Sequence, residues 1–399
     1  MGKKKVITVS TREATLKKRL RNHLKSLGFT KNDEGLLVPP GSSKDVIRAI
    51  HRVQRDDRLA ASDNFISDRF PHLIKYFASG HEINPARISP VLQLVSSSEW
   101  ETELFRLASL TWSVPVSNGF GRRLRYLVWD SHNGKLIGII AIGDPVFNLS
   151  VRDNLIKWDV KGRGQRLVNV MDAYVLGALP PYNMLLGGKL VACLIRSRDI
   201  YDDFTRAYGQ TRGIISKKKK NARLLAVTTS SSMGRSSVYN RLKLGGVEYF
   251  KPIGYTGGWG HFHIPDGLFA ELRDYLRDMG HHYADRHRFG QGPNWRMRTT
   301  RAALEILGFQ NDMLRHGIER EVFLCQLATN ALSILRKGQG RPNLSSLLST
   351  EDVAQQAVER WMLPRSMRMP EFKAWERENI RELLGDQYRK LPGVLRARA

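Results

Sequence analysis

The stretch Arg123–Gly143, RLRYLVWD-SHNG-KLIGIIAIG, decides the fold class. Its two outer segments, 123–130 and 135–143, are rich in β-branched, aromatic and other apolar side chains. They are joined by Ser-His-Asn-Gly, and an Asn-Gly pair between two such runs is a strong signal of a β-hairpin. The sequence therefore predicts two antiparallel strands at the centre of the chain.

Strand and helix signals continue on the C-terminal side of this hairpin. Their order, which is hairpin, strand, helix, strand, helix, hairpin, predicts a mixed α/β sheet. The predicted elements are a strand at 169–179, a buried helix at 185–196, a strand at 224–229, a short helix at 236–244, and two strands at 246–255 and 260–264.

The regions on either side of this sheet have the apolar spacing of amphipathic helices. Capping patterns begin helices at Ser10 and Ser98, a third helix follows Ser43, and Gly28 ends the first. C-terminal helices are predicted at 265–280, 301–309 and 319–336. We therefore expect a helical basic N-terminal domain at 1–115, an α/β core at 116–265, and a helical C-terminal region and arm at 266–399.

The charge of the chain favours a polyanionic partner. Among 399 residues, 64 are Lys or Arg and 38 are Asp or Glu, so the net charge is +26. Lys and Arg side chains that neutralise phosphates release condensed counterions, which makes nucleic acid the leading partner class.

The longest apolar stretch is too short to span a bilayer, and the N-terminus lacks the apolar core of a secretory signal. Two cysteines cannot form a disulfide framework. We expect a cytoplasmic protein that does not bind membranes.

Basic side chains are spread along the chain rather than confined to one tail. For any single run a solvated surface is the simpler interpretation, but the sum exceeds what solubility requires. The residues predicted to contact nucleic acid are Lys17, Lys18, Arg19, Arg48, Arg52, Lys217, Lys218, Lys219, Lys220, Arg235, Arg286, Arg288, Arg296 and Arg298.

Two carboxylates stand out because acids are few in the sheet region. Asp144 follows the second strand of the hairpin, and Asp172 lies within the next strand, both among apolar residues. An ionised carboxylate there needs a partner, and a pair of acids with a lysine is typical of a metal-dependent nuclease. The sequence has no D-x(n)-[DE]-x-K spacing, so capping or a buried salt bridge is the alternative role for each acid.

Lys189 and Tyr239 are further candidates for chemistry. Lys189 follows Gly187-Gly188 at the start of the predicted helix 185–196, where free N–H groups can bind an anion. Close packing of helix on sheet explains the two glycines equally well. Tyr239 follows the serine-rich end of a strand and faces either the core or a site.

His261 and His263 are two residues apart in the predicted strand 260–264. Side chains at this spacing share one face of a strand, so both imidazoles can enter one cleft or bind one metal ion. The alternative is a pair of hydrogen-bonded or surface histidines without a ligand. Because no acidic partner lies nearby, we assign no metal site.

Three segments carry a family resemblance. They are RYLVWDSHNGKLIGIIAIGDPVFNLSVRDNLIKWD, VMDAYVLGALPPYNMLLGGKLVACLI and SSSMGRSSVYNRLKLGGVEYFKPIGYTGGWGHFHIP. They resemble the DruA family, a component of the bacterial Druantia anti-phage system that also occurs in transposase-like proteins of mobile elements. The resemblance implies a role in defence against phage beside other Druantia proteins, including a large helicase. It carries over no catalytic residues.

The order of predicted elements at 100–265 is also similar to the acetyltransferase (GNAT) fold, particularly its phage Mom-like branch, which modifies adenine in DNA. In that fold a strand leads to a helix whose N-terminus takes the pyrophosphate of acyl-CoA through a Q/R-x-x-G-x-G/A turn. The matching stretch, 183–188 (NMLLGG), has neither the leading Gln or Arg nor that glycine spacing. Tyr239 falls near the usual tyrosine of the fold. The resemblance implies a GNAT-like core, and the cofactor stays unassigned.

The sequence therefore predicts a DNA-binding component of an anti-phage complex that recognises or processes phage DNA. The first alternative is an enzyme acting on DNA, either a base-modifying GNAT-like transferase or a nuclease or transposase-like strand cleaver. In that alternative the catalytic candidates are Asp144, Asp172, Lys189, Tyr239, His261 and His263. The second alternative is a scaffold that binds partner proteins through the C-terminal arm with Trp361 and Trp375. A second copy of the chain is left open as a partner.

Overall fold

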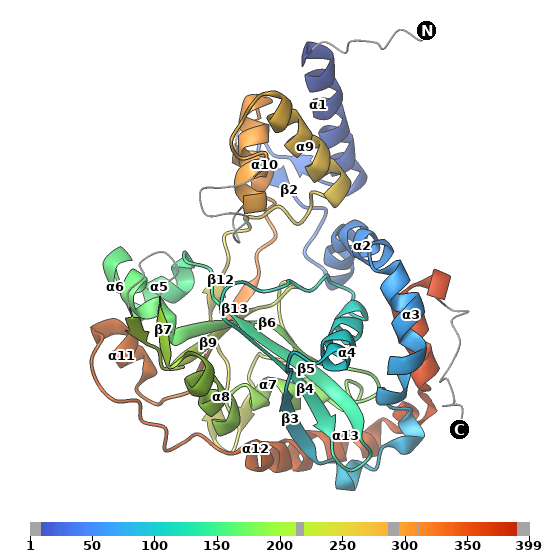
Figure 1. Cartoon of the computed structure of the whole chain (residues 1–399), viewed down its shortest axis with the longest axis vertical. Coiled ribbons are helices and arrows are strands. Elements are labelled where there is room, and N and C mark those ends of the chain that lie inside the picture. Colours follow the sequence, from blue (N-terminus) through green and yellow to red (C-terminus); the bar gives the residue numbers. More distant parts are fainter. Residues whose placement is uncertain (1–8, 213–218, 286–294, 310, 389–399) are drawn as a thin grey trace. The chain divides into compact units, whose positions relative to one another are not determined.

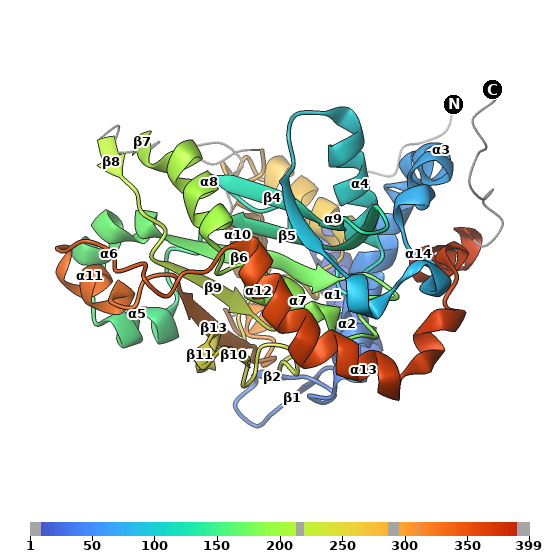
Figure 2. The same cartoon turned by 90° about the horizontal axis from the view of Figure 1, so that it is seen from below.

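The computed structural model describes residues 9–212, 219–285, 295–309 and 311–388. These residues form two compact units, each assembled from separate parts of the chain. Unit 1 contains the residues up to 60, 232–234 and 256–320, and unit 2 contains 61–231, 235–255 and the residues from 321 onward. Figures 1 and 2 show the helices and strands of both units in two views at right angles.

Unit 2 is built on a seven-stranded mixed sheet with the strand order β12-β13-β9-β6-β5-β4-β3. Of its neighbouring pairs, β6 and β9 are parallel and the others antiparallel. The hairpin predicted from the sequence is confirmed, with Asn133-Gly134 at its turn. The strands are β3 (Pro90–Leu94), β4 (Arg123–Asp130), β5 (Lys135–Gly143), β6 (Val170–Ala178), β9 (Ala226–Ser230), β12 (Lys251–Tyr255) and β13 (Glu321–Gln326).

Helices cover both faces of this sheet. On one face, α7 (Gly187–Leu194) and α12 (Thr350–Ala357) join a core that includes Met171, Val227 and Phe323. On the other, α5 (Ser150–Ile156) and α11 (Ala331–Lys337) pack with Val170, Ala226 and Leu324. Successive residues of β6, β9 and β13 alternate between these two cores, as the pleat of a β-strand requires. The remaining elements of unit 2 are α3 (Asp63–Leu73), α4 (Glu99–Leu110), α6 (Val160–Arg166), α8 (Arg198–Tyr208), β7 (Gln210–Arg212), β8 (Lys219–Asn221), β10 (Lys243–Leu244), β11 (Val247–Glu248), α13 (Leu363–Arg368) and α14 (Ile380–Leu384).

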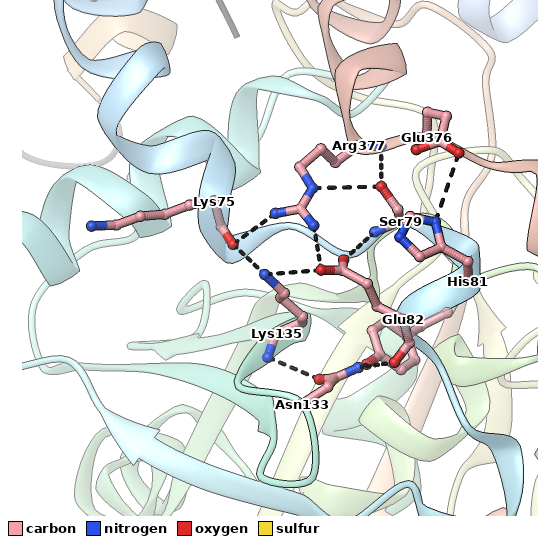
Figure 3. A network of polar contacts seen from close by, with 9 residues as sticks. Lys75, Ser79, His81, Glu82, Asn133, Lys135, Glu376 and Arg377 are labelled. Carbon is pink, nitrogen blue, oxygen red and sulfur yellow. Dashed lines mark hydrogen bonds and ion pairs between the residues drawn. The ribbon is translucent and has the colours of Figure 1, made fainter. Parts of the chain in front are cut away.

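The C-terminal segment of unit 2 is fastened to the chain around Gly80. Gly80 N–H donates to the Trp375 carbonyl over 2.7 Å, and the Phe372 side chain nearby is fully buried. In the network drawn in Figure 3, the Arg377 guanidinium is paired with the Glu82 carboxylate, which Lys135 Nζ also approaches to 3.4 Å. Long-range contacts of this kind join 370–379 to 75–82.

The Glu82 carboxylate is ionised in this network. Burial alone would raise its pKa, but the hydrogen bond from Ser79 N–H and the charges of Lys135 and Arg377 outweigh burial, so the pKa lies below its ordinary value. A carboxylate with a lowered pKa stabilises the folded state at neutral pH and loses that contribution on acidification.

Unit 1 is helical and has a core of its own. Helices α1 (Val9–Ser26) and α2 (Lys44–Ala60) pack with α9 (Asp266–Asp278) and α10 (Trp295–Ile306). The side chains in this core include Leu20, Ile50, Leu272 and Ala303. Polar contacts join the same parts of the chain, since Tyr275 donates to Glu13 over 2.7 Å and Arg19 lies 2.8 Å from Glu271. The unit also contains β1 (Thr30–Lys31) and β2 (Leu37–Val38).

Four predicted elements are wrong. Residues 246–255, expected as one strand, contain the separate strands β11 and β12, which pair with β10 and β13 respectively. Residues 319–336, expected as one helix, contain strand β13 and then α11. Residues 236–244, expected as a helix, form turns at 237–241 and strand β10 at 243–244; Arg241, with its φ of +58°, is in the left-handed region and cannot continue a helix. Residues 260–264 form turns rather than a strand, after Gly258 with its φ of +64°. The division into domains at 115 and 265 stays a prediction about independently folding parts.

Candidate functional site

Asp172 lies on β6 where this strand pairs with β9, at the level of Thr228. Thr228 Oγ1 donates to Asp172 Oδ1 over 2.7 Å. Burial raises the Asp172 pKa to about 6, although the Thr228 bond and the nearby Arg152 charge lower it in part. A carboxyl group that titrates near neutral pH is suited to general acid or base work.

Arg152 of α5 is a fully buried cation near Asp172. Its guanidinium donates to the Val146 and Phe147 carbonyls, each over 2.9 Å, and to Asp153 over 2.7 and 2.9 Å. Asp153 also accepts from Arg163 and from Trp158. Burial would raise the Asp153 pKa, but these donors together hold it below its ordinary value. The Arg152 charge is therefore balanced by an ionised partner, as a buried cation requires.

Asp144 is held in a salt bridge of its own. Arg122 Nε and Nη2 approach Asp144 Oδ1 to 2.8 and 2.7 Å, and Arg122 N–H donates to Oδ2 over 3.1 Å. The same guanidinium donates to the Val168 carbonyl over 2.8 Å. This geometry supports the alternative role of a salt bridge for Asp144, although its carboxylate is partly exposed.

Tyr239 and Asp172 lie on opposite faces of the sheet. Thr229, which follows Thr228 on β9, shares the face of Tyr239 and donates to the Ala173 carbonyl over 2.9 Å. Tyr239 donates to the Leu176 carbonyl over 3.1 Å and packs edge-on against Phe323. Burial raises the Tyr239 pKa well above its ordinary value, so the hydroxyl is neutral. The structure therefore does not bring these two candidates into one cleft.

The start of α7 is engaged within the fold. Gly187 N–H donates to the Tyr182 carbonyl over 2.8 Å, and Lys189 N–H donates to the Leu186 carbonyl over 2.9 Å. A Cβ at Gly187 would lie 2.6 Å from the Tyr182 oxygen, so close packing explains this glycine. The Lys189 ammonium lies 5.5 Å from the centroid of the Trp361 ring, at a distance suited to a cation–π contact.

His261 and His263 belong to a cluster of histidines in unit 1. His263 is buried, and its Nε2 is hydrogen-bonded to the Met313 carbonyl over 2.9 Å. Burial lowers the pKa of both residues to about 4. His51 and His316 are buried in the same region, where burial lowers their pKa values to about 3. All four imidazoles are therefore neutral at pH 7.

The predicted nucleic-acid contacts fall into three groups. Some of these cations are paired with acids: Arg19 with Glu271, Arg48 with Asp45, Arg52 with Asp56, and Arg296 with Asp266. Others are exposed or half-exposed at the surface: Lys17 and Lys18 on α1, Arg235, Arg298 on α10, and Lys219 and Lys220 on β8. Lys217, Lys218, Arg286 and Arg288 lie outside the described residues.

Comparisons with known proteins identify the family. The profile described as "Druantia protein DruA" matches residues 41–337. The chain is 64% identical over 387 residues to the Druantia protein DruA of Escherichia coli (strain UMEA 4076-1), covering 97% of this chain and 96% of that protein. The chain belongs to the DruA family. This DruA membership confirms the sequence resemblance and supports a role in anti-phage defence. No solved structure matches.

In this DruA-family chain, sequence reasoning missed the buried pair Arg152–Asp153 and the histidines His51 and His316. The first has a sequence signal, which is an adjacent Arg and Asp between apolar positions in SVRDNLI. The histidines have none, because they come from separate segments. No three or more His, Cys, Asp or Glu side chains within the described ranges are arranged to hold a metal ion. Within the same ranges, no helix has the length and apolar character needed to cross a membrane.

Proposed function

We propose that this DruA-family protein is the DNA-binding component of an anti-phage defence complex that recognises or processes phage DNA. The observation that carries the proposal is the net charge of +26. Such an excess attracts any polyanion, and the polyanion that distinguishes an infecting phage is its nucleic acid. Binding through phosphates has little sequence preference and weakens steeply as salt rises.

The contacts of the catalytic candidates support binding over chemistry. Asp144 is neutralised by Arg122, Lys189 lies against Trp361, and the Tyr239 hydroxyl is bonded to a main-chain carbonyl. Each of these three contacts stabilises the fold, and none of them requires a substrate. The exposed lysines of α1 and β8, in contrast, present charge to the solvent.

Neutralising Lys217, Lys218, Lys219 and Lys220 with glutamine is expected to weaken DNA binding and flatten its salt dependence. Each phosphate contact that is lost lowers the slope of log K against log salt by about 0.9 for duplex DNA. The measurement is fluorescence anisotropy of a labelled duplex over a series of salt concentrations.

The matched control removes four cations that are already paired with acids. Arg12, Arg69, Arg206 and Arg277 are ion-paired, exposed or half-exposed, and outside the predicted nucleic-acid contacts, and their replacement by glutamine lowers the net charge by the same amount. Most of the affinity should survive in this variant. Equal losses in both variants would mean that net charge alone acts, and a wild-type protein that binds no DNA at low salt would refute the proposal.

A second candidate function is enzymatic action on DNA, favoured by the raised pKa of Asp172. The path from β6 through α7 to the parallel strand β9 also supports the GNAT-like core that the sequence resemblance implies. If Asp172 is catalytic, Asp172→Asn abolishes any modification or cleavage of DNA and leaves DNA affinity unchanged. Incubation of labelled single-stranded, duplex and forked DNA with and without Mg²⁺ or Mn²⁺ tests this. Unaltered DNA in every reaction of the wild-type protein would exclude this candidate.

Other Druantia proteins, including a large helicase, are the partners that we propose for the complex. A DNA-binding subunit without chemistry of its own would leave the processing of DNA to them. The C-terminal segment is the proposed site of assembly. Truncation after Arg336 does not test this, because α12 and Phe372 belong to the core of unit 2. Met367→Glu, at a position of α13 that is 73% exposed, should instead weaken assembly in a pull-down with the partner proteins while DNA binding persists.

A further inference from the structure

Three apolar side chains are exposed together at one place in unit 2. The exposed fractions are 61% for Val146, 46% for Phe147 and 67% for Val160. The Arg163 guanidinium of α6 lies over the Phe147 ring, with Cζ 4.4 Å from its centroid. Val160 precedes Arg163 by three residues on α6 and so lies on the same side of that helix. We call these residues and their basic neighbours the α5–α6 surface.

Hydrogen bonds from a buried side chain fix the backbone at Phe147. The buried Arg152 donates to the carbonyls of Val146 and Phe147, and Asp153 accepts from both Arg152 and Arg163. Breaking these bonds would leave a charge buried without a partner, which is strongly unfavourable. The exposure of Phe147 is therefore a fixed feature of the fold. Exposed apolar side chains that lie together, rather than singly, are typical of an interaction site.

Cations surround this apolar patch. Lys157 and Lys161 flank Val160 and are exposed. Lys220 Nζ donates to the Gly164 carbonyl over 3.1 Å, which brings β8 beside α6. The exposed carboxylate of Asp159 accepts from Gly162 N–H over 2.6 Å and caps α6. In Figures 1 and 2, α5, α6 and α11 lie at one end of the sheet.

We propose that the α5–α6 surface binds single-stranded DNA, with an unpaired base stacked on Phe147 and flanking phosphates on Lys157 and Lys161. The inference rests on the proposed function and names its substrate class. An exposed aromatic ring among cations is the arrangement by which proteins hold single strands, because every base offers a flat face and every nucleotide a phosphate. In a duplex the base faces are stacked on one another and cannot reach Phe147. Lys157 and Lys161 form no ion pair within the described part of the chain, which favours nucleic acid over an apolar protein segment as the occupant.

Phe147→Ala is expected to weaken binding of a labelled oligothymidine by about 5- to 150-fold, the range of one lost base stack. Binding of a duplex of the same length should not change, because the phosphate contacts remain. Phe147→Trp should preserve or strengthen single-strand binding. The measurement is fluorescence anisotropy of the full chain at one salt concentration.

Tyr255→Ala is the matched control. Tyr255 lies on β12 of the same unit and is 40% exposed, close to the exposure of Phe147. Its loss should leave the affinity for both DNAs unchanged. Lys161→Gln should lower the affinity for single-stranded and duplex DNA by the same factor, since it removes a phosphate contact and no base stack.

The outcomes separate this inference from the proposed function. If the wild-type chain binds neither DNA, the proposed function fails. If it binds DNA and Phe147→Ala changes nothing, or weakens single strand and duplex equally, base stacking at this surface is refuted while DNA binding stands. If Phe147→Ala weakens binding of the single strand alone, and Phe147→Trp binds the single strand as tightly as the wild-type chain does, base stacking at the α5–α6 surface is established.

Discussion

Gly80→Ala is expected to release the C-terminal segment of unit 2 and lower the free energy of unfolding by about 3 kcal/mol, at the upper end for overpacking a buried site. A Cβ at position 80 would lie 2.0 Å from the Phe372 carbonyl oxygen and 2.6 Å from Lys373 Cα. Both atoms belong to the main chain, so no side-chain rotation relieves the overlap. The hydrogen bond from Gly80 N–H to Trp375 would also be lost.

The measurement for Gly80→Ala is thermal unfolding combined with hydrogen exchange of peptides from 365–388. We expect a fall in the midpoint of about 6–12 °C and faster exchange in those peptides. Gly164→Ala is the control, because no atom lies within 4 Å of a Cβ there. Alanine also favours a helix over glycine, so this variant should keep or raise the midpoint. Unchanged exchange at 365–388 in Gly80→Ala would contradict the close approach.

Acidification from pH 7 to pH 5 is expected to unfold unit 1 before unit 2. Burial lowers the pKa of His51 and His316 to about 3 and that of His263 to about 4. An unfolded histidine has a pKa of about 6.5, so below that pH the unfolded chain binds more protons than the folded one. The stabilisation is complete above pH 6.5 and declines as the pH falls toward 4. At pH 5 the loss is about 2 kcal/mol for each histidine.

Hydrogen exchange by mass spectrometry at pH 7 and pH 5, corrected for intrinsic rates, distinguishes the two units. Peptides from 9–60 and 256–285 should lose protection at pH 5, whereas those of the sheet in unit 2 should keep it. His51→Leu should restore part of the protection, because both ring nitrogens of His51 are buried without a hydrogen-bond partner. His72→Leu, at an exposed position of α3, is the control and should have no effect. Equal loss of protection in both units would contradict the role of the buried histidines.

The sequence predicts the centre of the sheet well because local chemistry determines it. Asn133-Gly134 fixes the hairpin, and the run at 170–178 alternates between two buried faces. Strand β13 was missed for a physical reason. Residues 321–325 of EVFLCQ are buried on both faces, so its apolar run has no period that separates strand from helix. Its place between β9 and β12 depends on residues far away in the chain.

The candidate site could be predicted less well than the fold. Asp172 was found because an acid among apolar residues is unusual, and its environment proved to raise its pKa. The salt bridge between Arg122 and Asp144 and the network around Arg152 depend on tertiary contacts that no spacing encodes. The register of β6 against β9 places Asp172 beside Thr228 on one face of the sheet, whereas the turn that carries Tyr239 packs against Phe323 on the other face.

The divided course of the chain through unit 1 has a consequence for synthesis on the ribosome. Helices α1 and α2 emerge early, yet their apolar stripes pack with residues of 264–318. About 200 residues separate the end of the first segment at 60 from residue 256, which corresponds to roughly 10–40 s of translation. Throughout that interval Leu16, Leu20 and Ile47 have no native partner from the later segment. The nascent N-terminus must therefore be kept from aggregating until the ribosome has passed residue 318, and unit 1 matures late although its sequence comes first.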